Sequence, residues 1–135
     1  MTNLLENNIE GNIGTQKYLC TIVWRNGKLL MDEPESVGGK DLGPDPFSTF
    51  LASLAGCTLS TLRMYIDRKG WDIPEINISL NLAQETNANL ETIISRTITF
   101  PTNISEEQKE RFLLIAEKWP ISKLLKNKIT INTAI

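Results

Sequence analysis

A stretch without any charged residue, from Pro46 to Leu62, constrains the fold of this chain more than any other feature. It follows Asp45, a residue type that caps the first N–H groups of helices, and proline is favoured at the first helical position. The helical pattern continues to Gly70, and glycine is typical of a helix end. We therefore predict one long helix over Pro46–Lys69, apolar on nearly every face and buried almost all round.

The segments before this helix predict an antiparallel hairpin and a loop. Residues 17–25 alternate in polarity and are rich in β-branched and aromatic side chains, as strands are. Asn26-Gly27 is a strong hairpin signal, and the return strand is expected over residues 28–31. Residues 32–46 are rich in proline, glycine and acids and predict a loop. Residues 1–16 are polar and predict either a weak strand or a flexible arm.

The segments after the helix predict a second hairpin and a second helix. Residues 76–82 and 90–100 have the alternation of strands, with a polar turn between them. Ser105 and Gln108 have the spacing of a capping box, which predicts a helix to about residue 118. One more helical turn and a final short strand are expected over residues 121–125 and 129–133. Antiparallel hairpins separated by helices predict an α+β fold, and the length predicts a single domain over residues 1–135.

Composition narrows the classes of function. The net charge is −2 and the basic residues are scattered, which argues against a nucleic-acid partner. The chain has neither a secretory leader pattern nor an apolar run of membrane length, so we expect a soluble, cytoplasmic protein with no membrane partner. Two cysteines and no histidine argue against a disulfide framework, a metal site or a histidine-activated nucleophile, and no cofactor is expected.

The predicted long helix also implies a partner. A sheet of five or six strands cannot cover a helix that is apolar on nearly every face, so another surface must cover the remainder. A second copy of the chain is the expected source of that surface. We therefore predict an obligate homodimer.

Three side chains are candidates for chemistry, and each also has a structural explanation. Cys57 lies in the middle of the predicted helix, as either a packing thiol or a reactive one. Cys20 lies on one face of the first predicted strand, as either a small core residue or a reserve thiol able to meet Cys57. Arg96 falls on the apolar side of its predicted strand, so it is either an ion-pair partner or a site residue, because unpaired buried charge is costly.

Four segments together resemble a known family. They are DEP…GGKDLGPDPF at residues 32–47, LASLAGCTLSTLRMYIDRKGW at 51–71, ISEEQKERFLLIAEKWP at 104–120 and KITINTAI at 128–135. Over about residues 17–135 the chain is similar to the OsmC/Ohr family of osmotically induced and organic-hydroperoxide-resistance proteins, in its OsmC-like branch. The resemblance implies an intertwined homodimer with antiparallel sheets around a long buried central helix. It also implies a cysteine that reduces organic hydroperoxides at the expense of a dithiol.

The resemblance assigns roles to individual residues. The attacking cysteine of the family matches Cys57, which the peroxide would convert to a sulfenic acid. A mid-helix thiol gains nothing from the helix dipole, so a cation must favour its thiolate form. Arg25 is the candidate for that cation and Arg96 is the alternative. Glu33 is the candidate acid that orients the arginine.

One departure from the family pattern leaves three hypotheses open. The resolving cysteine of the family lies in a K-C-P-V-H segment, where residues 118–122 of this chain read KWPIS, so Trp119 stands in its place. An external thiol could resolve the Cys57 sulfenic acid, or Cys20 could do so. In the third hypothesis the protein is a non-catalytic member of the family. Its pocket at the dimer interface, lined by Phe47, Phe50 and Trp119, then binds an apolar small molecule or serves only to hold the dimer together.

Overall fold

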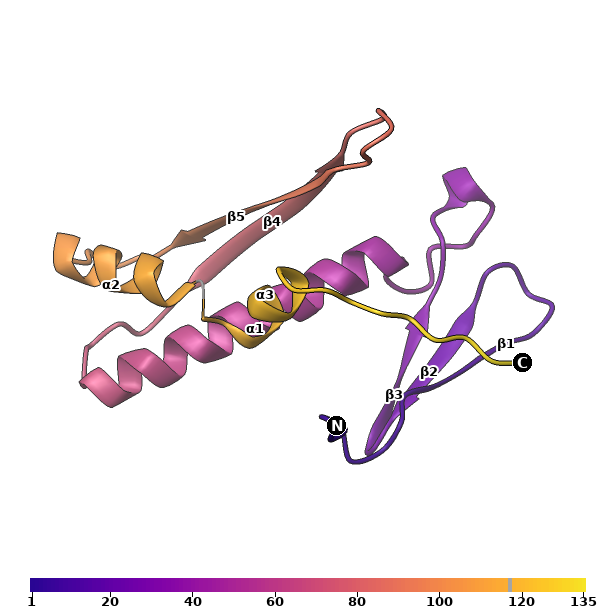
Figure 1. Cartoon of the computed structure of the whole chain (residues 1–135), viewed down its shortest axis with the longest axis horizontal. Helices are drawn as coiled ribbons and strands as arrows, with labels where there is room; N and C mark the ends of the chain where they lie inside the picture. The colour runs from indigo at the N-terminus through magenta and orange to yellow at the C-terminus, as the bar shows by residue number, and fades with distance from the viewer. Residues whose placement is uncertain (117) are drawn as a thin grey trace. The chain divides into compact units, whose positions relative to one another are not determined.

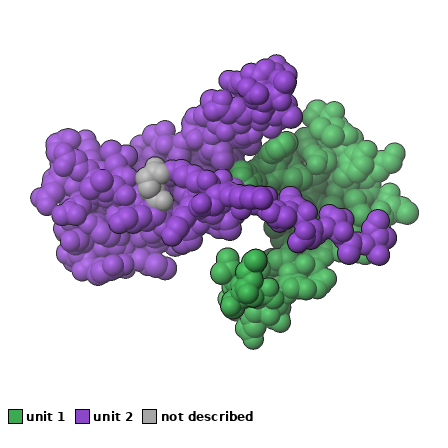
Figure 2. Space-filling model, viewed as in Figure 1, with its two compact units in different colours: residues 1–50 green, residues 51–135 purple. Residues whose placement is uncertain are grey.

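The computed structural model describes residues 1–116 and 118–135 of the chain. These residues form two compact units, Met1–Phe50 and Leu51–Ile135, shown in green and purple in Figure 2. The boundary between them falls inside the long helix. Each unit contains one antiparallel sheet, in agreement with the predicted α+β fold.

The first unit is built on a three-stranded antiparallel sheet in the order β1-β2-β3. Its strands are β1 (Glu10–Ile13), β2 (Cys20–Trp24) and β3 (Gly27–Met31). Trp24 pairs with Gly27 at the end of the β2–β3 hairpin, so the predicted hairpin is confirmed and its turn consists of Arg25 and Asn26. Of the two possibilities for the N-terminal segment, residues 10–13 form a strand against β2.

The loop after β3 is organised by one buried carboxylate, that of Asp32, which is 2% exposed. Its Oδ1 accepts hydrogen bonds from the backbone N–H groups of Tyr18 and Glu33, and its Oδ2 accepts from those of Lys40 and Leu42. Burial alone would raise the pKa of Asp32, but these four donors stabilise the charged form and hold the pKa below its ordinary value. The loop also contains the short 3-10 helix η1 (Glu35–Val37).

The long helix α1 (Pro46–Lys69) has the predicted bounds. At its start the Asp45 carboxylate accepts hydrogen bonds from the backbone N–H of Phe47 and from the hydroxyl of Ser48. The Ser48 hydroxyl is the main reason that the pKa of Asp45 lies below its ordinary value. At its end Gly70 adopts a φ of 69°, which glycine tolerates without steric cost.

Within the single chain, α1 is buried along one stripe rather than all round. The buried residues follow one another at a spacing of four, which places them on one face of the helix: Leu54, Thr58, Leu62 and Ile66. Large apolar side chains on other faces are exposed, and Met64 is 64% exposed.

The second unit pairs β4 (Asn77–Gln84) with β5 (Thr92–Thr99) in one antiparallel hairpin (Figure 1). Its core combines residues of α1 with residues from the following segments, namely Leu62, Ile66, Ile73, Phe112 and Trp119. The aromatic rings of Phe100 and Phe112 stack with their centroids 5.2 Å apart.

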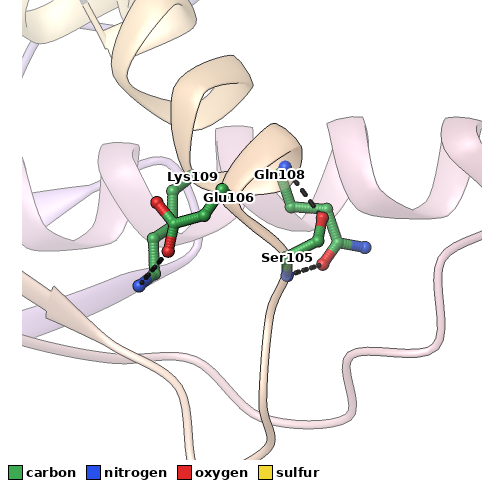
Figure 3. A network of polar contacts seen from close by, with 4 residues as sticks. All are labelled: Ser105, Glu106, Gln108 and Lys109. Atoms are coloured by element: carbon green, nitrogen blue, oxygen red, sulfur yellow. Dashed lines mark hydrogen bonds and ion pairs between the residues drawn. The ribbon is translucent and has the colours of Figure 1, made fainter.

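Two shorter helices follow the hairpin. α2 (Glu106–Ala116) begins with the predicted capping box, in which the Gln108 N–H donates to the Ser105 hydroxyl and the Ser105 N–H donates to the Gln108 side chain (Figure 3). The described helix extends to Ala116, whereas its end was predicted at about residue 118, and residue 117 lies outside the described part of the chain. α3 (Pro120–Leu125) is the predicted additional helical turn.

The predicted final strand over residues 129–133 is wrong, because residues 128–135 form no regular secondary structure. The alternation that predicted it is present, yet Ile131 is 84% exposed. A strand is stable only when its backbone groups pair with a neighbouring strand, and such a pairing is not found for this segment within the described residues.

Candidate functional site: a cysteine and an arginine in the second unit

Cys57 lies halfway along α1 with a half-buried side chain. Its Sγ accepts a hydrogen bond from the backbone N–H of Ile121, at a distance of 3.5 Å. Figure 1 shows the corresponding arrangement of α3 beside the middle of α1. A backbone N–H aimed at sulfur favours a negatively charged sulfur, because it places the positive end of a dipole there.

Arg96 reaches the same region from β5. Its Nη1 donates hydrogen bonds to the hydroxyl of Thr58 and to the hydroxyl of Ser122, each over 3.0 Å. The Thr58 hydroxyl donates its own hydrogen to the Leu54 carbonyl over 2.8 Å, so its oxygen is left to accept from Arg96. Thr58 follows Cys57 in α1, and Ser122 follows Ile121 in α3. The arginine therefore bridges the two segments that contact the thiol.

The electrostatics connect Arg96 to Cys57. Burial lowers the pKa of Arg96, and the charge of the Cys57 thiolate acts in the opposite direction. The ion pairs found among the described residues join other groups, namely Arg63 to Asp67 and Lys109 to Glu106. Among the described residues, hydroxyl groups rather than carboxylates hold the guanidinium, so its positive charge is available to act on Cys57.

Trp119 covers one face of the arginine. The guanidinium carbon of Arg96 lies 4.3 Å from the centroid of the indole ring, a cation–π contact. Trp119 is 1% exposed, and its Nε1 is buried without a hydrogen-bond partner among the described residues. Three residues of one short segment thus contact the site: Trp119 and Ser122 touch Arg96, and Ile121 touches Cys57.

Two cavities in the second unit border Arg96. One has a volume of 430 Å³. Its lining contains two cations, Arg96 and Lys126, two hydroxyl-bearing residues, Thr92 and Ser122, and three aliphatic side chains. The other has a volume of 720 Å³ and is mainly apolar. Trp119 lines this larger cavity, together with Ile98, Phe100, Ile104, Phe112 and Leu113.

The remaining predicted site residues lie in the first unit. Arg25 is exposed in the β2–β3 turn. Glu33 is half-buried after β3, where it lines a 340 Å³ cavity together with Cys20. Phe47 and Phe50 are 68% and 37% exposed on the first turns of α1. The roles assigned to these residues stay predictions.

Neither cysteine forms a disulfide. The thiol of Cys20 donates a long hydrogen bond to the Tyr18 carbonyl, with 3.7 Å between sulfur and oxygen. The described residues contain no cluster of three or more acidic, histidine or cysteine side chains that could hold a metal ion. None of the described helices is both long enough and apolar enough to cross a membrane.

Sequence reasoning missed Thr58, Ile121 and Ser122 as site residues. Ile121 contributes a backbone N–H, for which the side chain carries no signal. The two hydroxyl groups lie 38 and 26 residues away from Arg96 along the chain. The one sequence signal that could have indicated these hydroxyl groups was Arg96 on the apolar side of its strand, because a cation there needs hydrogen-bond acceptors nearby.

Comparison with known proteins agrees with the fold. The chain superimposes on an OsmC-like protein from Mycoplasma pneumoniae with a TM-score of 0.71 at 18% identity, covering 93% of this chain and 90% of that one. An organic hydroperoxide resistance protein from Elizabethkingia anophelis gives a TM-score of 0.65 at 16% identity, with 94% and 92% covered. An organic hydroperoxide resistance protein from Bacillus subtilis gives a TM-score of 0.61 at 16% identity, covering 90% of this chain and 92% of that one.

Curated proteins gave no match to this sequence. The family model described as OsmC-like protein matches residues 38–134, a range that contains Cys57, Arg96 and Trp119. This range is well over half of the chain and includes all of α1 through α3. The chain therefore belongs to the OsmC-like protein family.

Proposed function

We propose that this protein is a thiol-dependent reductase of organic hydroperoxides in stress defence, with Cys57 as its single attacking cysteine. The observation that carries the proposal is the contact set of Cys57 and Arg96. The thiol receives a backbone N–H, and a guanidinium without a carboxylate partner among the described residues acts on it electrostatically. Structural relatives named organic hydroperoxide resistance proteins support the substrate class.

The first half of the proposed reaction oxidises Cys57. Its thiolate attacks the outer oxygen of the hydroperoxide, so that an S–O bond forms while the O–O bond breaks. The alkoxide leaves and takes up a proton to become an alcohol, and Cys57 becomes a sulfenic acid. Arg96 favours the thiolate before the attack, because an uncompensated cation stabilises the negative sulfur.

The second half returns Cys57 to the thiol. An external dithiol attacks the sulfenic sulfur, releasing water and forming a mixed disulfide, and its second thiol then displaces Cys57. An external reductant is proposed because Trp119 occupies the position of the resolving cysteine. Cys20 is the competing candidate for this step, and a Cys20→Ser variant distinguishes the two.

Steady-state consumption of tert-butyl hydroperoxide with dihydrolipoamide tests the proposal. Wild type and Cys20→Ser are expected to turn over at similar rates, whereas Cys57→Ser is expected to be inactive. Loss of turnover in Cys20→Ser would instead assign the resolving role to Cys20. No turnover by wild type with any dithiol would reject the reductase.

The identity of the stabilising cation is tested separately. Arg96→Met is expected to lower the rate at pH 7 by about tenfold or more, because the variant lacks the positive charge that is proposed to stabilise the attacking sulfur. Arg25→Met, in the β2–β3 turn, is the matched control. If Arg25→Met has the larger effect, the predicted pair of Arg25 as cation and Glu33 as orienting acid is favoured instead.

Binding of an apolar small molecule is the second candidate function. The 720 Å³ cavity favours it, since its lining is mainly aromatic and aliphatic. Leu113 lines this cavity and is 73% exposed, whereas Leu114 is 66% exposed and absent from its lining. Leu113→Arg is therefore expected to weaken the binding of an apolar fluorescent probe, and Leu114→Arg is the control. Equal binding by both variants would reject this site.

We further propose that the protein is a cytoplasmic homodimer with one domain per chain. Two free thiols suit a reducing compartment. Exposed apolar side chains on α1, such as Met64, suit a surface that a second copy covers.

A further inference from the structure

We propose that Trp119 is a positioning residue whose indole ring holds the Arg96 guanidinium beside Cys57 and thereby sustains the reactivity of that thiol. The inference rests on the proposed role of Cys57 as the attacking cysteine. It gives Trp119 a function of its own, whereas the resemblance to the family implies only that a resolving thiol is missing at this position.

The supports of Arg96 define its position from two directions. Thr58 and Ser122 accept hydrogen bonds from Nη1, and these bonds fix one edge of the guanidinium. The ring of Trp119, 4.3 Å from the guanidinium carbon, fixes one of its faces. Thr58, Ser122 and Trp119 are all buried, so their side chains have little freedom to move away.

These three supports are all uncharged, and this decides what Arg96 can do. A carboxylate would hold the guanidinium more strongly, but it would also neutralise the charge that Cys57 needs. An aromatic face stabilises a buried cation through its quadrupole and carries no net charge that competes for it. The Arg96 charge is thus left to act on Cys57, whose charge in turn acts to raise the pKa of Arg96.

Trp119 lies at the start of the segment that contacts the site. It directly precedes Pro120, the first residue of α3, and is the N-cap residue of that helix. The next two residues place the Ile121 N–H on Cys57 and the Ser122 hydroxyl on Arg96. One segment thus presents a donor to the sulfur, an acceptor to the arginine and a ring to the cation.

Alkylation of Cys57 by iodoacetamide tests this role without requiring peroxidase turnover. All variants carry Cys20→Ser, so that only one thiol reacts. Trp119→Phe keeps an aromatic face and is expected to react at pH 7 at nearly the wild-type rate. Trp119→Met has a flexible apolar side chain without that face and is expected to react about threefold to thirtyfold more slowly. At about pH 10 all variants are expected to react alike, because the thiol then ionises without help from Arg96.

A double mutant identifies Arg96 as the intermediary. In an Arg96→Met background, Trp119→Met is expected to cause no further loss, since both substitutions remove the same effect. If Trp119→Met lowers the alkylation rate by the same factor in the Arg96→Met background as in the wild-type background, the proposal is overturned. So would a Trp119→Phe variant as slow as Trp119→Met, because bulk rather than the aromatic face would then matter.

Fluorinated tryptophan provides a test that leaves the fold intact. Within the described residues, Trp119 is the tryptophan with a cation over its ring. Fluorination weakens cation–π contacts without changing the shape of the indole appreciably, so the alkylation rate at pH 7 is expected to fall stepwise with each added fluorine. A constant rate across the series would contradict the proposed role even if Trp119→Met fails to fold.

Discussion

At the scale of single residues, two charged side chains organise the segments around them. Asp32 organises its loop through four backbone donors, and Arg96 joins a strand to two helices through two hydroxyl groups. Both side chains are satisfied by uncharged partners. Each charge can therefore act on its surroundings, the first on backbone dipoles and the second on Cys57.

The Asp32 carboxylate makes stability depend on pH. Its pKa is lowered in the folded protein, so its contribution is present above the unfolded-state pKa of about 3.9 and is lost as the pH falls through the folded-state value. Asp32→Asn is expected to lower the urea midpoint at pH 7, and this difference should shrink at pH 3. Equal differences at both pH values would contradict the assignment. Glu35→Gln is the control, because Glu35 is exposed in the same loop.

At the scale of elements, the segment that begins α3 contacts both Cys57 and Arg96. Its Ile121 N–H already touches the Cys57 sulfur, so a thiol introduced nearby has a short path to it. The arrangement of α1, β5 and α3 brings together residues that sequence order separates.

Trp119→Cys tests this arrangement by placing a thiol in the segment that contacts Cys57. After one equivalent of tert-butyl hydroperoxide, the variant is expected to form an internal disulfide with Cys57, which mass spectrometry detects as a loss of two hydrogens. Trp119→Leu leaves a comparable cavity without a thiol and is the matched control. If the introduced thiol stays reduced while Cys57 is oxidised, the two positions do not face each other during the reaction.

The helices and strands differ in how well the sequence predicts them. The bounds of α1 were predicted correctly because Asp45 and Gly70 act locally, and the capping box of α2 was recognised for the same reason. The prediction of a strand over residues 129–133 was wrong, because a strand forms only where another strand, distant in sequence, is available to pair with it. The hydrogen-bond partners of Arg96 could not be predicted, because Thr58 and Ser122 are distant from it in sequence.

At the scale of the whole molecule, apolar side chains remain exposed on several helices. Met64 on α1 is 64% exposed, and Leu113 and Leu114 on α2 are 73% and 66% exposed. Exposed apolar side chains of this kind suit a surface that binds a partner, and a second copy is the proposed partner.

Sedimentation velocity at micromolar concentration tests the proposed dimer. The expected mass is about 30 kDa, twice the 15.2 kDa of one chain. Met64→Glu is expected to weaken the dimer, because it places a charge on an apolar surface that the partner would cover. Leu4→Glu, in the N-terminal segment, is the control. A wild-type protein that sediments as a monomer would reject the dimer.

Cys57 is proposed as the thiol that hydroperoxides attack. A single-turnover reaction with one equivalent of tert-butyl hydroperoxide, followed by dimedone labelling and peptide mass spectrometry, tests this role most directly. A dimedone adduct is expected on Cys57 and not on Cys20, and labelling is expected to be slower in Arg96→Met. No loss of peroxide and an unlabelled Cys57 would contradict it.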